Sequence, residues 1–307
     1  MNQSTEFLII GGGIAAASTA YWLSRYGQVL LLEQESQPGF HSTGRSAALF
    51  MESYGTPQVR ALTMASRAFL QAPPDGFSDY PLLTPRGAMM VAEHGQDDML
   101  RSHWDVMRQV TQKGRLLNMQ EACDYFPVLR AEKILGGIYE PDASDMDVHS
   151  IHQGYLRGAK KNGAQLICDA QVTQIKRSSQ VWHVQAGGHT YEARVLINAA
   201  GAWADAVAEM AGVKPIGLVP KRRSALIFEP PIGLNCADWP MTIGIDESWY
   251  IKPDAGKLLG SPANADPVAP HDVQPEELDI AMAIDRIQTM TTLEIRRPLR
   301  TWAGLRS

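Results

Sequence analysis

A glycine-rich turn near the N-terminus constrains the fold more than any other feature of the sequence. Residues 7–10 form a short apolar run, and a Gly-Gly-Gly-Ile-Ala-Ala stretch over 11–16 follows at once. Residues 17–25 have the composition of a helix, and the apolar run 29–32 ends at Glu33. A strand, a glycine turn, a helix, a second strand and an acid, in this order, are typical of a dinucleotide-binding βαβ unit. The sequence therefore predicts a nucleotide site at this turn.

Each small residue of the turn has a physical role in such a unit. Gly11 permits the tight turn, and Gly13 lets a pyrophosphate approach the backbone. Ala16 is small enough for the helix to pack on the sheet, and the helix N-terminus offers free N–H groups to the phosphates. Glu33 is placed to bind a ribose diol and would repel a 2′-phosphate, which favours FAD or NAD over NADP. The alternative is a tight turn that binds no ligand.

Composition excludes several classes of partner. The net charge of −5 does not suggest binding to nucleic acid or to an anionic membrane surface. No apolar run is long enough to span a bilayer, and residues 1–6 lack the basic start of a signal peptide. The three cysteines are widely spaced, which fits a reducing compartment and argues against a cysteine zinc site. We therefore expect a cytoplasmic protein without a metal or a transmembrane segment.

Parallel-type and antiparallel-type segments alternate along the chain. The polar loop 37–48 is long enough to serve a ligand, and the strand 195–198 breaks into the small residues 199–202. His149 and His152 share a helix face, and without a third ligand we expect them to be solvated or capping groups. Further elements are predicted as helices over 58–70, 97–112, 149–161 and 276–289 and as strands over 88–92, 135–139, 164–176, 181–192, 217–228, 249–260 and 293–297.

Together with the glycine turn, five stretches carry a resemblance to a known family. They are the loop 42–46, the strand and turn 198–203, and the strings 54–62, 220–224 and 302–307. With these residues the chain resembles the FAD-dependent D-amino acid oxidase (DAO) superfamily from residue 7 to its last residue. Within that superfamily it is most similar to D-arginine dehydrogenase.

The resemblance implies an α/β fold with two interleaved parts. One is a glutathione-reductase-type FAD-binding Rossmann domain, expected over residues 1–79 and 139–202 with its C-terminal part absent. The other is an α+β substrate domain built on an antiparallel sheet, expected over residues 80–138 and 203–302. The chain stops at Ser307, where members of the family continue into a further FAD-binding segment. A truncated, catalytically inactive remnant of the FAD fold is therefore the alternative reading.

The resemblance also implies a reaction, the oxidative deamination of a D-amino acid to its 2-oxo acid and ammonia through an imino acid. FAD is the expected cofactor, and the electron acceptor stays open, as does the choice between dehydrogenase and oxidase. Arg223 and Arg306 match the arginines that bind the substrate carboxylate. Tyr250 matches a phenol that donates to the same carboxylate, and Tyr54 matches a lid over the substrate. An NAD-dependent dehydrogenase is disfavoured, because the loop 42–48 and the strand 198–203 add nothing to NAD binding.

The expected cofactor-binding residues come from the βαβ unit and from the family pattern. Ser46, Ala47 and Ala48 match the loop that passes the flavin ring, and Val172 matches a backbone contact to adenine. The complete expected set is Gly11, Gly13, Ile14, Ala15, Ala16, Glu33, Gln34, Ser42, Thr43, Arg45, Ser46, Ala47, Ala48, Val172, Ala200, Gly201 and Trp203.

Two positions depart from the pattern of D-arginine dehydrogenase in the expected substrate pocket. Ala88 stands where the family has a glutamate that pairs with the substrate guanidinium, and Leu49 stands where it has a histidine. A buried guanidinium without a carboxylate is costly. The substitutions therefore predict a substrate with a neutral or apolar side chain.

Overall fold

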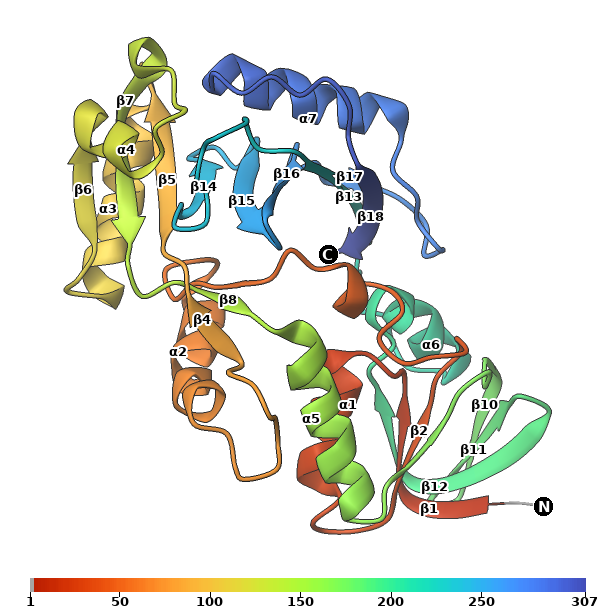
Figure 1. Cartoon of the computed structure of the whole chain (residues 1–307). Coiled ribbons are helices and arrows are strands. Elements are labelled where there is room, and N and C mark those ends of the chain that lie inside the picture. The colour runs from red at the N-terminus through yellow and green to blue at the C-terminus, as the bar shows by residue number, and fades with distance from the viewer. Residues whose placement is uncertain (1–2) are drawn as a thin grey trace.

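The structure is a computed structural model that describes residues 3–307. Residues 1 and 2, with which the first expected domain begins, lie outside the described part. Two large sheets occupy the two halves of the molecule, and the segment that follows β2 runs between them (Figure 1). This combination of a largely parallel sheet with a largely antiparallel one confirms the expected fold class.

The six-stranded sheet is built around the glycine turn. Its strand order is β10-β11-β12-β1-β2-β9, and β12, β1, β2 and β9 run parallel to one another. The core of the sheet is apolar on both faces, because β2 is buried along its whole length. The strands are β1 (Gln3–Ile10), β2 (Val29–Leu32), β9 (Gln165–Ile167), β10 (Val172–Ser178), β11 (Val181–Ala186) and β12 (His189–Asn198).

Helices cover both faces of this sheet. On one face, α1 (Ile14–Leu23) and α5 (Val148–Lys161) lie side by side (Figure 1), and Gly158 allows α5 to approach the ring of Tyr21 closely. The side chain of Asp147 caps α5 by accepting a hydrogen bond from the Ser150 N–H group. On the other face lies α6 (Ala204–Met210), where Val207 joins the cluster of Leu8 and the other buried residues. Thus α6 packs on the six-stranded sheet, although the expected FAD-binding domain ends at residue 202, before this helix. The expected domain limits stay a prediction.

The nine-stranded sheet is antiparallel except where β14 pairs with β5. Its order is β17-β13-β16-β15-β14-β5-β7-β6, and β18 pairs with β13. Its strands are β5 (Ala88–Glu93), β6 (Arg115–Asn118), β7 (Ile134–Glu140), β13 (Lys221–Phe228), β14 (Met241–Gly244), β15 (Tyr250–Asp254), β16 (Lys257–Ser261), β17 (Asp266–Pro267) and β18 (Arg300–Arg306).

Successive side chains of β13 point to opposite faces, and this alternation separates packing from chemistry. Arg222 and Ser224 face α7 (Glu277–Met290), where both bind the buried carboxylate of Asp279. Arg223 and Ala225 face the opposite side and line a cavity. Near the β6 edge, α3 (Asp97–Val110) packs on the cavity side of the sheet and α4 (Met119–Tyr125) on the α7 side.

A small sheet and one helix complete the fold. β8 (Ser144–Met146) pairs with both β3 (Leu49–Phe50) and β4 (Leu83–Pro85). The helix α2 (Pro57–Gln71) begins one residue before the expected start, with Thr56 as its cap. Single-turn helices lie at Thr43–Arg45, Ala131–Lys133 and Gly201–Trp203.

The expected last strand over 293–297 is wrong. Buried and exposed residues alternate there, but the backbone does not pair with a strand: the Ile295 N–H group donates instead to the side chain of Gln288. Pro298 follows and disfavours continuation of a paired strand. The last strand is β18, seven residues further on.

Candidate functional site

Two cavities meet between the sheets. One, of about 480 Å³, lies at the carboxyl ends of the parallel strands, and we call it the glycine-turn cavity because Gly11, Gly12 and Gly13 line it. The other, of about 780 Å³, lies under the nine-stranded sheet, and we call it the arginine cavity because Arg223 and Arg306 line it. Ser42 lines both, and its hydroxyl donates to the Leu305 carbonyl oxygen at 2.7 Å. The cavities therefore adjoin where the first loop meets the last strand.

The three glycines of the turn differ in what a side chain would meet at their positions. Gly11 has a φ of +116°, and a Cβ atom there would lie 2.4 Å from the Ala199 carbonyl oxygen. A Cβ atom on Gly12 would lie 2.6 Å from the carboxylate of Glu33. At Gly13 the nearest atom would be the Thr43 hydroxyl oxygen, 3.3 Å away. The fold thus requires glycine at 11, and a side chain at 12 would displace the Glu33 carboxylate, whereas the open side of Gly13 suits a bound group that approaches the backbone.

Hydrogen bonds tie the turn to its surroundings. The Thr43 hydroxyl oxygen accepts from the Ile14 N–H group at 3.0 Å, at the N-terminus of α1. Glu33 lies just after β2, and one of its carboxylate oxygens accepts from the Glu35 N–H group at 2.9 Å. This acid is buried and lines the cavity. The arrangement combines a helix N-terminus with a carboxylate on the adjacent strand, as a dinucleotide site requires.

Most of the expected cofactor residues line one cavity or the other. The glycine-turn cavity is lined by Gly11, Gly13, Glu33, Gln34, Ser42, Thr43, Val172, Ala200, Gly201 and Trp203. The arginine cavity is lined by Ser42, Arg45, Ser46, Ala47 and Ala48. Ile14, Ala15 and Ala16 line neither; they form the first turn of α1, and Ala16 is fully buried.

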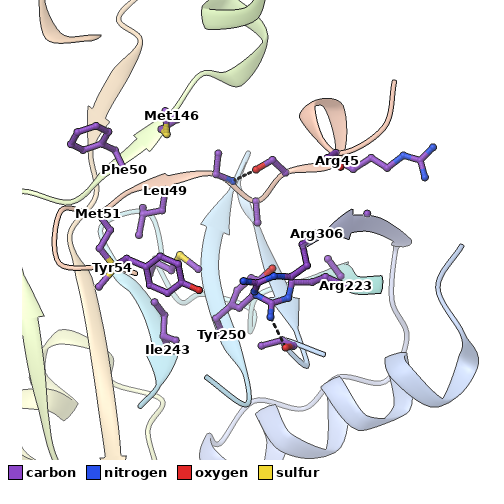
Figure 2. A pocket seen from close by; sticks show the side chains of 18 of the residues that line it. Arg45, Leu49, Phe50, Met51, Tyr54, Met146, Arg223, Ile243, Tyr250 and Arg306 are labelled. Carbon is purple, nitrogen blue, oxygen red and sulfur yellow. Dashed lines mark hydrogen bonds between the residues drawn. The ribbon is translucent and has the colours of Figure 1, made fainter. Parts of the chain in front are cut away.

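All four expected catalytic residues lie together in the arginine cavity, and Figure 2 shows their polar ends directed toward one another. Arg223 lies on β13 and Arg306 on the adjacent strand β18, two positions apart in register on the same face. Tyr250 lies on β15, and Tyr54 comes from the loop before α2. Three strands and a loop far apart in sequence therefore supply one polar cluster.

Within the described chain, neither guanidinium group is ion-paired with a carboxylate. Arg223 donates to the Ala263 carbonyl oxygen at 2.7 Å and to the Asn264 carbonyl oxygen at 3.1 Å, which fixes its orientation. In residues 3–307 no ion pair is formed by Arg223 or Arg306. Burial and the nearby charge of Arg306 lower the pKa of Arg223, although a guanidinium stays charged at neutral pH. Two cations in one partly buried cavity make a site for an anion.

Two phenols and one acid flank the cations. Burial raises the pKa of Tyr250 and outweighs the opposing effects of a hydrogen bond with Ser261 and of the two guanidinium groups, so its hydroxyl is protonated and can donate. The Tyr54 hydroxyl donates to the carboxylate of Glu247 at 3.0 Å. Glu247 also lines the arginine cavity, in the turn between β14 and β15. Tyr54 is 38% exposed, so this contact lies at the open side of the cavity.

The wall beside Tyr54 is apolar. Leu49 and Ile243 lie near the Tyr54 ring (Figure 2). Ala88 is buried and does not line the cavity, while Met90, two residues further along the same strand face, does. The apolar part of the wall is formed by Leu49, Phe50, Met51, Met90, Met146, Met241 and Ile243.

Hydrogen bonds of Arg45 connect the loop to the last strand. Its guanidinium points away from the polar cluster (Figure 2) and donates to the carbonyl oxygens of Val273 and Ala303 at 3.0 and 3.2 Å. The carbonyl oxygen of Arg45 in turn accepts from the indole of Trp302 at 3.0 Å. The Arg45 guanidinium is therefore engaged with the protein, and its backbone faces the cavity side.

Three polar residues were missed or misjudged from the sequence. Glu247 stands in an ordinary turn sequence, and only the fold brings it over the cavity. Glu140 is buried at the end of β7 and accepts from the Glu52 N–H group and the Ser53 hydroxyl, next to Tyr54. His152 is buried rather than solvated, and its Nε2 atom lies 2.8 Å from the Gly12 carbonyl oxygen. The apolar residues three and four positions from His152, namely Val148, Tyr155 and Leu156, are a signal that could have indicated its burial.

Comparison with known proteins identifies the class. The structure is similar to glycine oxidase from Geobacillus kaustophilus, with a TM-score of 0.84 at 20% identity over 99% of this chain and 83% of that one. It is equally similar to FAD-bound L-α-glycerophosphate oxidase from Mycoplasma pneumoniae, with a TM-score of 0.86 at 19% identity and the same coverage. The fold is therefore that of the FAD-dependent oxidases.

The sequence places the chain in a family. Residues 6–307 match the DAO family, FAD dependent oxidoreductase, and the chain belongs to it. Human dimethylglycine dehydrogenase is 26% identical over 268 residues, which are 84% of this chain and 30% of that protein. The chain thus spans about a third of the length of this relative. FAD is the cofactor of this family, and the glycine-turn cavity fits a dinucleotide by its open Gly13 and buried Glu33.

No helix within 3–307 is both long and apolar enough to cross a membrane. In the same residues, no group of three or more His, Cys, Asp or Glu side chains is arranged to hold a metal ion.

Proposed function

We propose that this chain carries the catalytic site of an FAD-dependent enzyme that oxidises the amine-bearing carbon of an amino acid. The observation that carries the proposal is the pair of guanidinium groups, Arg223 and Arg306, that have no carboxylate partner within the described chain and face one cavity. A substrate carboxylate supplies the missing partner, since arginine's planar fork matches it. The relatives support this reading, because two of them are named for glycine and dimethylglycine.

The cofactor is proposed to extend through both cavities. Its pyrophosphate would lie against Gly13 and the N-terminus of α1, with the adenosine ribose at Glu33. Its flavin would lie along the backbone of Ser46, Ala47 and Ala48, in the arginine cavity. When bound, FAD supplies a hydride acceptor for the substrate Cα–H.

The side chains of the cavity would orient the substrate. Arg223, Arg306 and the protonated Tyr250 would hold the carboxylate and so present the Cα–H to the flavin. Tyr54 would close over the substrate and exclude water. Loss of a hydride and a proton converts the amino acid to an imino acid, which water hydrolyses to the 2-oxo acid and ammonia.

The apolar wall supports a substrate with a neutral side chain, and the D configuration is taken from the resemblance to the D-amino acid oxidases. Leu49, Met90, Met241 and Ile243 would pack against such a side chain at no electrostatic cost. Glu247 favours a second candidate, a D-amino acid with a cationic side chain, because its carboxylate faces the same cavity. Glu247 could therefore bind a substrate guanidinium in place of the family's glutamate, which is Ala88 in this chain.

The test is anaerobic bleaching of the flavin by a panel of substrates. We expect D-leucine and D-methionine to bleach it faster than their L-enantiomers, 2-hydroxy acids or glycerol 3-phosphate. Arg306→Ala should lower the second-order bleaching rate by about 30-fold to several thousand-fold, since a buried charge pair lost is worth about 2–5 kcal/mol. Arg296→Ala, which removes an exposed arginine, should not.

The same panel separates the candidates. Preference for D-arginine over D-leucine, lost in Glu247→Gln, would favour the cationic substrate and contradict the neutral one. Bleaching by hydroxy acids alone would contradict amine oxidation altogether. A purified protein that is colourless and takes up no FAD would support the inactive remnant.

A further inference from the structure

His152 touches both backbone segments that form the wall of the glycine-turn cavity, without lining the cavity itself. It lies on α5 and is only 3% exposed. Its Nε2 atom lies 2.8 Å from the carbonyl oxygen of Gly12, the central residue of the turn. A carbonyl oxygen can only accept, so Nε2 carries the hydrogen and donates it.

The other edge of the ring packs against the polar loop. A Cβ atom on Gly39 would lie 3.1 Å from Cε1 and 3.3 Å from Nδ1 of His152, so the ring lies directly against the Gly39 backbone. The Gly39 carbonyl oxygen accepts from the Gly44 N–H group at 2.8 Å, which closes the loop. This loop carries Thr43, whose hydroxyl oxygen binds the Ile14 N–H group. One imidazole therefore contacts both the glycine turn and the polar loop.

We propose that His152 is a positioning residue for the cofactor, which holds the glycine turn and the loop 39–44 at the separation that the FAD pyrophosphate requires. Burial lowers the pKa of His152 and outweighs the opposing effect of the hydrogen bond to Gly12, so the ring is a neutral donor at pH 7. A neutral ring binds the Gly12 carbonyl without placing a charge behind the turn. The proposal concerns FAD binding and does not depend on which substrate is oxidised.

A purely structural role is the competing explanation, and matched variants separate the two. His152→Gln keeps an N–H donor at the position of Nε2, whereas His152→Asn places its amide closer to the main chain and cannot reach Gly12. Asp147→Ala serves as the control: it removes the cap of the same helix, where Asp147 accepts from the Ser150 N–H group at 2.8 Å, and leaves the contact with the turn intact.

The measurement is the Kd for FAD, obtained from the quenching of flavin fluorescence on titration with apoprotein, together with the Tm of each apoprotein. We expect His152→Asn to weaken FAD binding about tenfold, the effect of one lost hydrogen bond and a loosened wall. His152→Gln and Asp147→Ala should stay within about threefold of the wild type, although Asp147→Ala lowers the Tm of the apoprotein.

Two results would overturn the proposal. One is equal FAD affinity in His152→Gln and His152→Asn, because the position of the donor would then not matter. The other is an Asp147→Ala variant that loses as much affinity as His152→Asn, because general loosening of α5 would then explain the effect.

Discussion

At the scale of single residues, Gly13 is a position where the fold tolerates a side chain but the proposed FAD site does not. Its backbone has a φ of −78°, which any residue can adopt, and a Cβ atom there meets only the Thr43 hydroxyl. We expect Gly13→Val to leave the Tm of the apoprotein within a few degrees of the wild type and to abolish FAD binding. Gly11→Ala should instead unfold the protein, because of the positive φ and the contact with Ala199. Wild-type FAD stoichiometry in Gly13→Val would contradict the assignment of the turn.

Glu140 gives a residue-scale prediction for pH. Burial raises the pKa of Glu140 above its ordinary value, outweighing the hydrogen bonds from Ser53 and Glu52. The folded protein therefore binds this proton at a pH where the unfolded chain has already lost it, and stability falls as pH rises from about 4.3 through the folded-state pKa. In urea unfolding at several pH values, the wild type should lose free energy of unfolding relative to Glu140→Gln as pH rises. Parallel curves for the two proteins would contradict this.

At the scale of elements, one buried ion pair joins α7 to the strand that carries Arg223. The Arg222 Nε atom donates to the Asp279 carboxylate at 2.8 Å, and both residues are buried. We expect Asp279→Ala to destabilise the protein by about 1–3 kcal/mol, because it removes the buried acceptor of Arg222 and Ser224. The guanidinium then keeps only its exposed partners, Glu276 and Asp266. Glu277→Ala, an exposed change in the same turn of α7, should cost less than about 0.5 kcal/mol. The check is chemical denaturation; similar losses in the two variants would show that the pair contributes little.

Local patterns predicted most helices and the parallel strands, but long-range pairing decided the rest. The strand 29–32 and the Asp147 cap depend only on residues close in sequence, so the sequence alone can indicate both. The alternation over 293–297 looked like a strand, yet a strand exists only where a partner is free, and β13 pairs with β18 instead. The four expected catalytic residues came from the resemblance, and their catalytic roles stay a prediction. Glu247 was missed, because a turn sequence does not say which cavity its acid will face.

At the scale of the whole molecule, the two sheets meet along the loop that follows Glu33. Ser42 and Arg45 tie this loop to β18, and His152 holds its start against the glycine turn. The two cavities consequently share a wall made of one short segment. A change in that segment should affect the nucleotide end and the substrate end together, which sequence distance alone would not suggest.

The two guanidinium groups that face the arginine cavity also affect turnover. Under the proposed function, Arg223 and Arg306 recognise the carboxylate, which oxidation at the neighbouring carbon leaves unaltered. The 2-oxo acid formed in the cavity therefore keeps the contacts that held the amino acid, while it loses the amine. Departure of the product then requires the same charge pairs to break, so an enzyme of this design is inhibited by its own product and by simple carboxylates of similar shape.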